Sequence, residues 1–113
     1  MIQIFHNNRC SKSREVLELI NNAGQELEVI EYLKQGPDAA ALKDILKKLA
    51  MKPEQIIRKN EPLYKDQFAG KILSDEEWIQ VLVAHPILIE RPIVVNGDKA
   101  VIGRPPENVL TIL

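Results

Sequence analysis

Cys10 is the residue of this chain most suited to covalent chemistry. It follows the polar run His6-Asn7-Asn8-Arg9 and directly precedes a segment with helical periodicity. The free N–H groups and the positive end of a helix stabilise a thiolate, which is the reactive form of cysteine. Basic residues flank Cys10 on both sides, and the first acidic residue of the chain is Glu15. This setting favours a reactive thiol over the alternative, an inert cysteine that packs as a small hydrophobe.

Three neighbours could tune this thiolate. His6 lies four residues before Cys10, Ser13 lies three residues after it, and Arg14 adds a positive charge in the first helical turn. The imidazole and the hydroxyl could stabilise the sulfur anion by charge or by a hydrogen bond. The alternative for His6 is an ordinary solvated imidazole, and for Ser13 an exposed first-turn serine.

Arginine placement is the second chemical signal. Among five arginines and ten lysines, three arginines lie far from Cys10 in the sequence: Arg58, Arg91 and Arg104. A guanidinium group binds tetrahedral oxyanions through paired hydrogen bonds, which the point charge of lysine cannot reproduce. If these three converged on the thiolate, they would form an oxyanion pocket. The alternative is a set of unrelated surface ion pairs.

Sequence spacing around the cysteine excludes two familiar motifs. A tyrosine-phosphatase loop needs an arginine six residues after the cysteine, where this chain has Val16. A Cys-x-x-Cys redox pair needs a second thiol at Ser13. Pro92 lies just before a β-prone segment and is a candidate cis-proline, and a cis X-Pro bond is rare enough to be informative. The alternative is a trans proline that begins a strand.

Composition limits the remaining function classes. The chain has 113 residues, of which 45% are hydrophobic and 27% charged, as expected for one soluble globular domain. Its formal net charge of −1 disfavours nucleic acid as a partner. No apolar run approaches the roughly 18 residues that cross a membrane, and no secretory signal is evident, so we expect a cytoplasmic protein. One cysteine excludes an intrachain disulfide, and with two histidines it leaves too few ligands for a structural zinc site. Nothing in the sequence suggests a metal or a bound organic cofactor.

The elements that would position these residues follow from local patterns. Residues 2–5, a helix over 12–23 and a strand over 27–32 form a β-α-β unit, whose two strands should be parallel. Asp38 and the Ser74–Glu77 capping box begin two helices of a mostly helical insertion at about 37–86. Residues 93–95 and 99–102, separated by Asn96-Gly97, predict a hairpin. A short last helix then follows, with Val109, Leu110 and Leu113 expected to face inward.

This element order predicts the fold class. The order is β-α-β, a helical insertion and then β-β-α, which is the α/β arrangement of a thioredoxin-like mixed sheet. We expect a single thioredoxin-like domain over residues 1–113.

Four motifs together resemble the glutaredoxin-coupled arsenate reductase family. They are His6-Asn-Asn-Arg-Cys-Ser-Lys-Ser-Arg14, Ile57-Arg-Lys-Asn60, His85-Pro-Ile-Leu-Ile-Glu-Arg-Pro-Ile-Val-Val95 and Gly103-Arg-Pro-Pro-Glu107. They occur in order with consistent spacing over essentially the whole chain. The chain ends without the charged carboxy-terminal extension of the plasmid-type reductases, and it resembles the shorter chromosomal members.

The resemblance implies a mechanism and a role for each residue. Cys10 would attack arsenate, while Arg58, Arg91 and Arg104 would bind its oxygens and His6 and Ser13 would tune the thiolate. Glutathione, a co-substrate, would then attack the adduct, and glutaredoxin would clear the mixed disulfide. Two alternatives remain open: a Spx-like transcriptional regulator that binds RNA polymerase, and a thiol transferase with another substrate.

Overall fold

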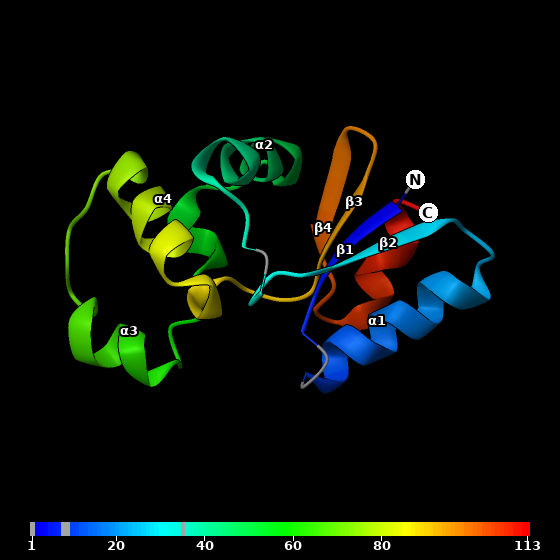
Figure 1. The fold of residues 1–113 in the computed structure, drawn as a ribbon, viewed down its shortest axis with the longest axis horizontal. Coiled ribbons are helices and arrows are strands. Elements are labelled where there is room, and N and C mark those ends of the chain that lie inside the picture. Colours follow the sequence, from blue (N-terminus) through cyan, green and yellow to red (C-terminus); the bar gives the residue numbers. More distant parts are fainter. Residues whose placement is uncertain (1, 8–9, 35) are drawn as a thin grey trace. The chain divides into compact units, whose positions relative to one another are not determined.

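The chain folds into two compact units. The computed structural model describes residues 2–7, 10–34 and 36–113. The first unit consists of Met1–Gln35 together with Arg91–Leu113, and the second consists of Gly36–Glu90. Figure 1 shows that the first unit is built from both ends of the chain, coloured blue to cyan and orange to red. The second unit covers the segment in which the sequence predicts a helical insertion.

A four-stranded mixed sheet forms the centre of the first unit, in the order β2-β1-β3-β4. β1 pairs in parallel with β2 and antiparallel with β3, and β3 pairs antiparallel with β4. This arrangement confirms the predicted fold class. The strands are β1 (Ile2–His6), β2 (Leu27–Glu31), β3 (Ile93–Asn96) and β4 (Lys99–Ile102).

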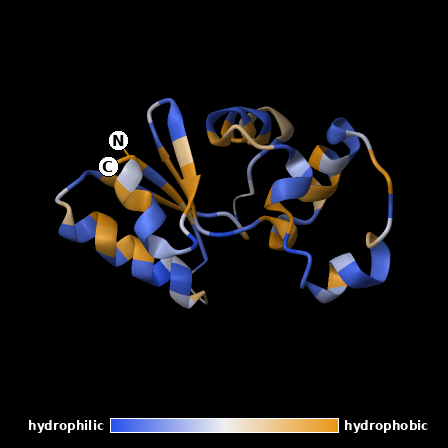
Figure 2. Ribbon diagram, turned by 180° about the vertical axis from the view of Figure 1, so that it is seen from behind, coloured by the Kyte–Doolittle hydropathy of each residue, from blue (hydrophilic) through white to orange (hydrophobic). Residues whose placement is uncertain are grey.

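Helix α1 (Ser11–Asn22) packs its apolar side into the core of this unit. Its polar and apolar residues alternate along the ribbon in Figure 2, as expected for a helix with one buried face. Burying each large apolar side chain of this kind contributes about 1.5–3 kcal/mol. The buried core residues come from α1, from two strands and from the end of the chain: Ile2, Ile4, Val16, Ile20, Val94 and Val109.

The carboxy-terminal segment differs from the sequence prediction in one respect. The last helix, η3 (Pro106–Thr111), is a 3-10 helix, and its Leu110 is 54% exposed, so the prediction that Leu110 faces inward is wrong. A 3-10 helix repeats every three residues, which aligns Pro106 and Val109 on the buried side and turns Leu110 away from it. The predicted Asn96-Gly97 turn is shifted by one residue. The hairpin turn consists of Gly97 and Asp98, because Asn96 belongs to β3 and pairs with Lys99 on β4.

The second unit is helical. Asp38 caps α2 (Ala39–Leu49) by accepting a hydrogen bond from Ala41 N–H at 2.8 Å. The predicted Ser74–Glu77 capping box is present at the start of α4 (Asp75–Ala84). The shorter elements are η1 (Pro53–Ile56), α3 (Pro62–Gln67) and η2 (Pro86–Leu88).

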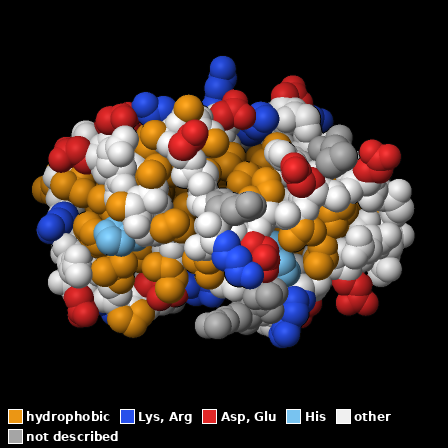
Figure 3. Space-filling model, in the orientation of Figure 1, with side chains coloured by type: hydrophobic (Ala, Val, Ile, Leu, Met, Phe, Trp, Pro, Cys, Tyr) orange, Lys and Arg blue, Asp and Glu red, His pale blue; other side chains and the backbone are white. Residues whose placement is uncertain are grey.

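The polar surface carries charges of both signs. Lysine and arginine side chains alternate with acidic ones over the face drawn in Figure 3, in keeping with the net charge of −1. No helix within the described ranges is both long enough and apolar enough to cross a bilayer.

Candidate functional site

Cys10 lies at the amino-terminal boundary of α1. It is the N-cap residue, with extended backbone angles of φ −95° and ψ 121°. Its N–H donates to Asn7 O at 2.9 Å, and its own carbonyl accepts from Arg14 N–H at 3.2 Å, which is the first bond of the helix. The cysteine is 8% exposed. The thiol therefore lies at the positive end of a 12-residue helix, where backbone dipoles favour a sulfur anion.

Arg104 contacts the sulfur directly. Its Nη2 donates to Cys10 Sγ at 3.2 Å, although the two residues are 94 positions apart in the sequence. Its Nε donates to the backbone carbonyl of Arg91 at 2.6 Å. A planar guanidinium fixed at two points holds its donors in one orientation, which matters for binding an anion. The structure thus brings together two of the residues that the sequence singles out, Cys10 and Arg104.

Arg91 and Pro92 lie between the end of the second unit and β3. The Arg91–Pro92 peptide bond is cis, and so is Arg104–Pro105. Pro92 O accepts from Gly103 N–H at 2.8 Å, which ties the segment before β3 to the segment after β4. A side chain at Gly103 would not fit here, because its Cβ would lie 2.7 Å from Val16 Cγ2 and 3.0 Å from Pro92 Cγ.

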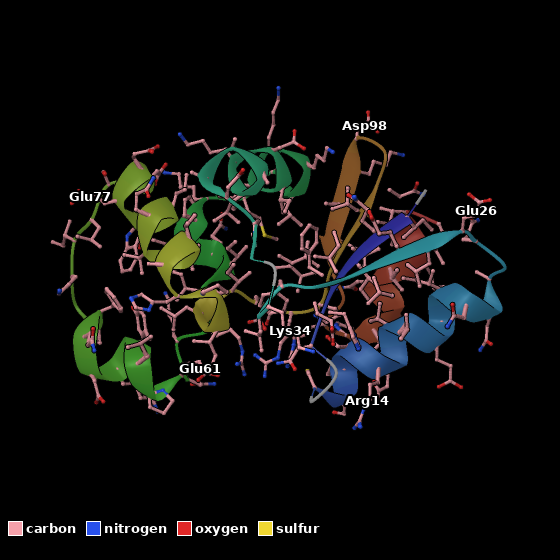
Figure 4. All side chains as sticks on the ribbon, viewed as in Figure 1. Arg14, Glu26, Lys34, Glu61, Glu77 and Asp98 are labelled. Atoms are coloured by element: carbon pink, nitrogen blue, oxygen red, sulfur yellow. The ribbon has the colours of Figure 1, made fainter. Side chains whose placement is uncertain are left out.

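His6 ends β1 and is only 5% exposed, so it is not a solvated loop imidazole. Burial lowers the pKa of His6 below its ordinary value of 6.5; nearby Glu31 opposes this shift and Arg14 adds to it. Glu31 is the register partner of His6 on β2. Figure 4 labels Arg14 on the first part of α1. The buried imidazole therefore favours its neutral form.

Ser13 is fully buried and anchors the loop before the cysteine. Its Oγ accepts a hydrogen bond from Asn7 N–H at 3.3 Å. The Asn7 carbonyl also accepts from Cys10 N–H, so the backbone of Asn7 is hydrogen-bonded to both Ser13 and Cys10. Asn7 was not among the predicted site residues, although asparagine is typical of turns that precede helices.

Arg58 belongs to the second unit and pairs with two carboxylates there. Its Nη1 forms a hydrogen-bonded ion pair with Glu61, and its Nε lies 3.9 Å from Glu90 Oε1. Its side chain is 19% exposed. Figure 4 labels Glu61 close to the start of α3. This pairing gives Arg58 a local structural role within its unit.

These contacts define what the first unit can do chemically. A thiol at a helix start, held by a guanidinium, is suited to nucleophilic attack on an electrophile that carries negative oxygens. Over the part of the chain that the structure describes, no group of three or more His, Cys, Asp or Glu side chains could hold a metal ion. The chemistry of these residues is that of a thiol and an arginine.

The mixed sheet and the helix that Cys10 caps define a protein with a thioredoxin-like fold. The pattern of the ArsC family matches residues 5–112, and the chain belongs to that family.

Known proteins similar to this chain support the assignment. The uncharacterised protein YfgD of Escherichia coli (strain K12) is 51% identical over 114 aligned residues, covering 99% of this chain and 96% of YfgD. A protein of Haemophilus influenzae named arsenate reductase is 46% identical, with 97% of each chain covered. The solved structure of an arsenate reductase from Vibrio cholerae superimposes with a TM-score of 0.95 at 44% identity, covering 99% of this chain and 97% of that one.

Proposed function

We propose that this protein reduces arsenate to arsenite, with Cys10 as the nucleophile. The single observation that carries the proposal is the 3.2 Å contact between Arg104 Nη2 and Cys10 Sγ at the start of α1. It is the arrangement that a thiolate attacking an oxyanion needs, because the guanidinium can stabilise both the sulfur and the bound oxygens. Family membership and the relatives named arsenate reductase support the choice of substrate.

The proposed reaction begins when the Cys10 thiolate attacks the arsenic atom of arsenate. A sulfur–arsenic bond forms, an arsenic–oxygen bond breaks, and the departing oxygen takes up protons and leaves as water. Arg91 and Arg104 neutralise the remaining oxygens during this step. Arsenic is still in the +5 state in the adduct.

Reduction then needs two electrons, which thiols supply. Glutathione attacks the adduct, arsenic falls to the +3 state and leaves as arsenite, and the two sulfurs are oxidised to a mixed disulfide. Glutaredoxin returns Cys10 to its thiol by taking the glutathione. Overall, one arsenate and two thiols give one arsenite, one disulfide and one water. The single cysteine of the chain fits this scheme, because the second thiol comes from another molecule.

Arg58 is the third arginine that the family resemblance assigns to the oxyanion. Within its own unit Arg58 is paired with Glu61 and Glu90, so its guanidinium would have to bind arsenate beside these carboxylates or in place of them. Its participation therefore stays a prediction. Substituting Arg58→Lys preserves the charge and removes the paired geometry, and it should raise KM for arsenate if Arg58 binds the oxyanion.

The deciding experiment is arsenate-dependent oxidation of NADPH, coupled through glutathione reductase, glutathione and glutaredoxin. We expect turnover by the wild-type protein and none by Cys10→Ser. Lys99→Ala, an exposed substitution on β4, serves as the control for a lost charge. Activity that survives Cys10→Ser would refute the mechanism. Cys10-dependent turnover of a glutathione mixed disulfide without any response to arsenate would instead identify a thiol transferase.

A further inference from the structure

The turn that carries Arg104 is held by a side chain outside the proposed reaction. Asn108 Nδ2 donates to Arg104 O at 3.1 Å and to Ile102 O at 3.3 Å. The Asn108 N–H donates to Pro105 O at 3.0 Å. Asn108 therefore bonds to three carbonyls of the segment that runs from the end of β4 into η3, and these bonds fix the course of the backbone on both sides of Arg104.

We propose that Asn108 is a positioning residue that aims Arg104 at Cys10. This inference rests on the proposed function, in which Arg104 stabilises the sulfur and the oxyanion. Asn108 acts only through Arg104: its amide bonds to the backbone carbonyl of Arg104, while the guanidinium of Arg104 bonds to the sulfur.

Hydrogen bonds, rather than packing, must do this positioning. Both Arg104 and Asn108 are exposed residues, so no tightly packed core immobilises them. A free arginine side chain has about 2 kcal/mol of rotamer entropy to lose when it is held in one geometry. The Arg104 side chain is held at Nε by Arg91 O and at Nη2 by the sulfur. Both contacts require its Cα to stay at a fixed point, and the Asn108 amide restrains the carbonyl next to that Cα.

The opposite side of the turn is fixed independently. Gly103 N–H donates to Pro92 O, and Gly103 packs closely against Val16 and Pro92. The part of the turn before Arg104 is therefore anchored to the sheet without Asn108. Removing the amide should loosen the part after Arg104 and leave the fold intact, because the exposed carbonyls can bond to water instead.

The test measures how fast iodoacetamide alkylates Cys10 in the full-length protein. Asn108→Ala removes both side-chain hydrogen bonds of Asn108 and should slow alkylation at pH 7 by about two- to fivefold, as expected from partial loss of the contact between Arg104 and the sulfur. Asn96→Ala is the matched control: Asn96 Nδ2 also donates to a backbone carbonyl of the carboxy-terminal segment, Ile112 O, and it does not bond to the Arg104 turn. We expect alkylation of Asn96→Ala at the wild-type rate.

A double-mutant cycle separates positioning from a general structural effect. In an Arg104→Ala background, Asn108→Ala should cause no further loss, since there is no guanidinium left to aim. The isosteric Asn108→Asp keeps the shape of the side chain and loses the amide donor, so its alkylation should be slowed at least as much as that of Asn108→Ala. The slowing should persist in 0.5 M salt, which screens the added negative charge. Equal alkylation rates for wild type, Asn108→Ala and Asn108→Asp would overturn the inference, as would an undiminished loss in the Arg104→Ala background.

This readout is independent of the proposed substrate. Alkylation needs neither arsenate nor glutathione, so a protein that fails to reduce arsenate can still show the coupling between Asn108 and Arg104. Conversely, suppose that the protein reduces arsenate and that its alkylation rates show no coupling between Asn108 and Arg104. That result would refute only the role of Asn108.

Discussion

Replacing Arg104 with lysine separates its charge from its geometry. In the structure one guanidinium donates from Nε to Arg91 O at 2.6 Å and from Nη2 to Cys10 Sγ at 3.2 Å. A lysine ammonium has its three donors on one nitrogen and cannot reach both acceptors along the same planar fork. Arg104→Lys therefore keeps the positive charge, while it loses either the anchor or the contact with sulfur.

The expected size of the effect follows from the contact with sulfur. A hydrogen bond to a charged group contributes about 1.5–3 kcal/mol, which is about 10- to 150-fold in an equilibrium constant. A less stabilised anion is also a better nucleophile, and this offsets about half of the change on a logarithmic scale. The net prediction is alkylation of Cys10 that is slower by about three- to tenfold at pH 7.

The assay is the second-order rate of iodoacetamide alkylation from pH 5 to pH 9. Lys12→Ala is the control, because Lys12 is an exposed cation on the same helix whose ion pair is with Glu15. An exposed, screened charge should change the rate by less than about twofold. If Arg104→Lys matched the wild type at every pH, or if Lys12→Ala lost as much, the bound guanidinium would not be what stabilises the sulfur.

Three further substitutions test the fold. Burial lowers the pKa of His6, so the unfolded chain takes up the proton first as pH falls through 6.5. The free energy of unfolding, measured by urea titration, should therefore fall from pH 7.5 to pH 5.5. In His6→Gln this fall should be smaller. Gly103→Ala should lower the free energy of unfolding by about 1–3 kcal/mol, because the new Cβ meets Val16; an unchanged urea midpoint would contradict the close packing. Asp38→Ala should cost about 1 kcal/mol through loss of the bond from Ala41 N–H, with faster amide exchange in α2 as the measurement and unchanged exchange as the contrary result.

Local signals in the sequence were sufficient to predict several of the helix starts. The capping box at Ser74 and Glu77, the N-cap at Asp38 and the helix start beside Cys10 are each encoded within a few residues, and each is present. Such signals act through backbone groups of the same turn, so no knowledge of tertiary structure is needed to recognise them. The predicted fold class was confirmed for the same reason, since the order of the elements allows few arrangements.

Contacts between distant segments could not be predicted in this way. Nothing in the residues near Arg104 indicates that its guanidinium binds both a carbonyl of Arg91 and a sulfur 94 residues away. Likewise, the Ser13 hydroxyl was a candidate for stabilising the thiolate, whereas its observed hydrogen bond is with the backbone N–H of Asn7. Leu110 was predicted to face inward because its spacing fits an α-helix, whereas the segment folds as a 3-10 helix.

Arg58 and Arg104 differ in what their guanidinium groups contact, and this difference bears on catalysis. Arg58 is paired with Glu61 and Glu90, so an incoming oxyanion at its guanidinium would meet two negative carboxylates. Arg104 donates to a neutral carbonyl and to sulfur. The sulfur that it contacts is itself the proposed attacking atom. The charge that stabilises the thiolate before the reaction is thus in place to stabilise arsenate oxygens once the sulfur has bonded to arsenic. An oxyanion bound at Arg58 would instead lie beside the negative charges of Glu61 and Glu90.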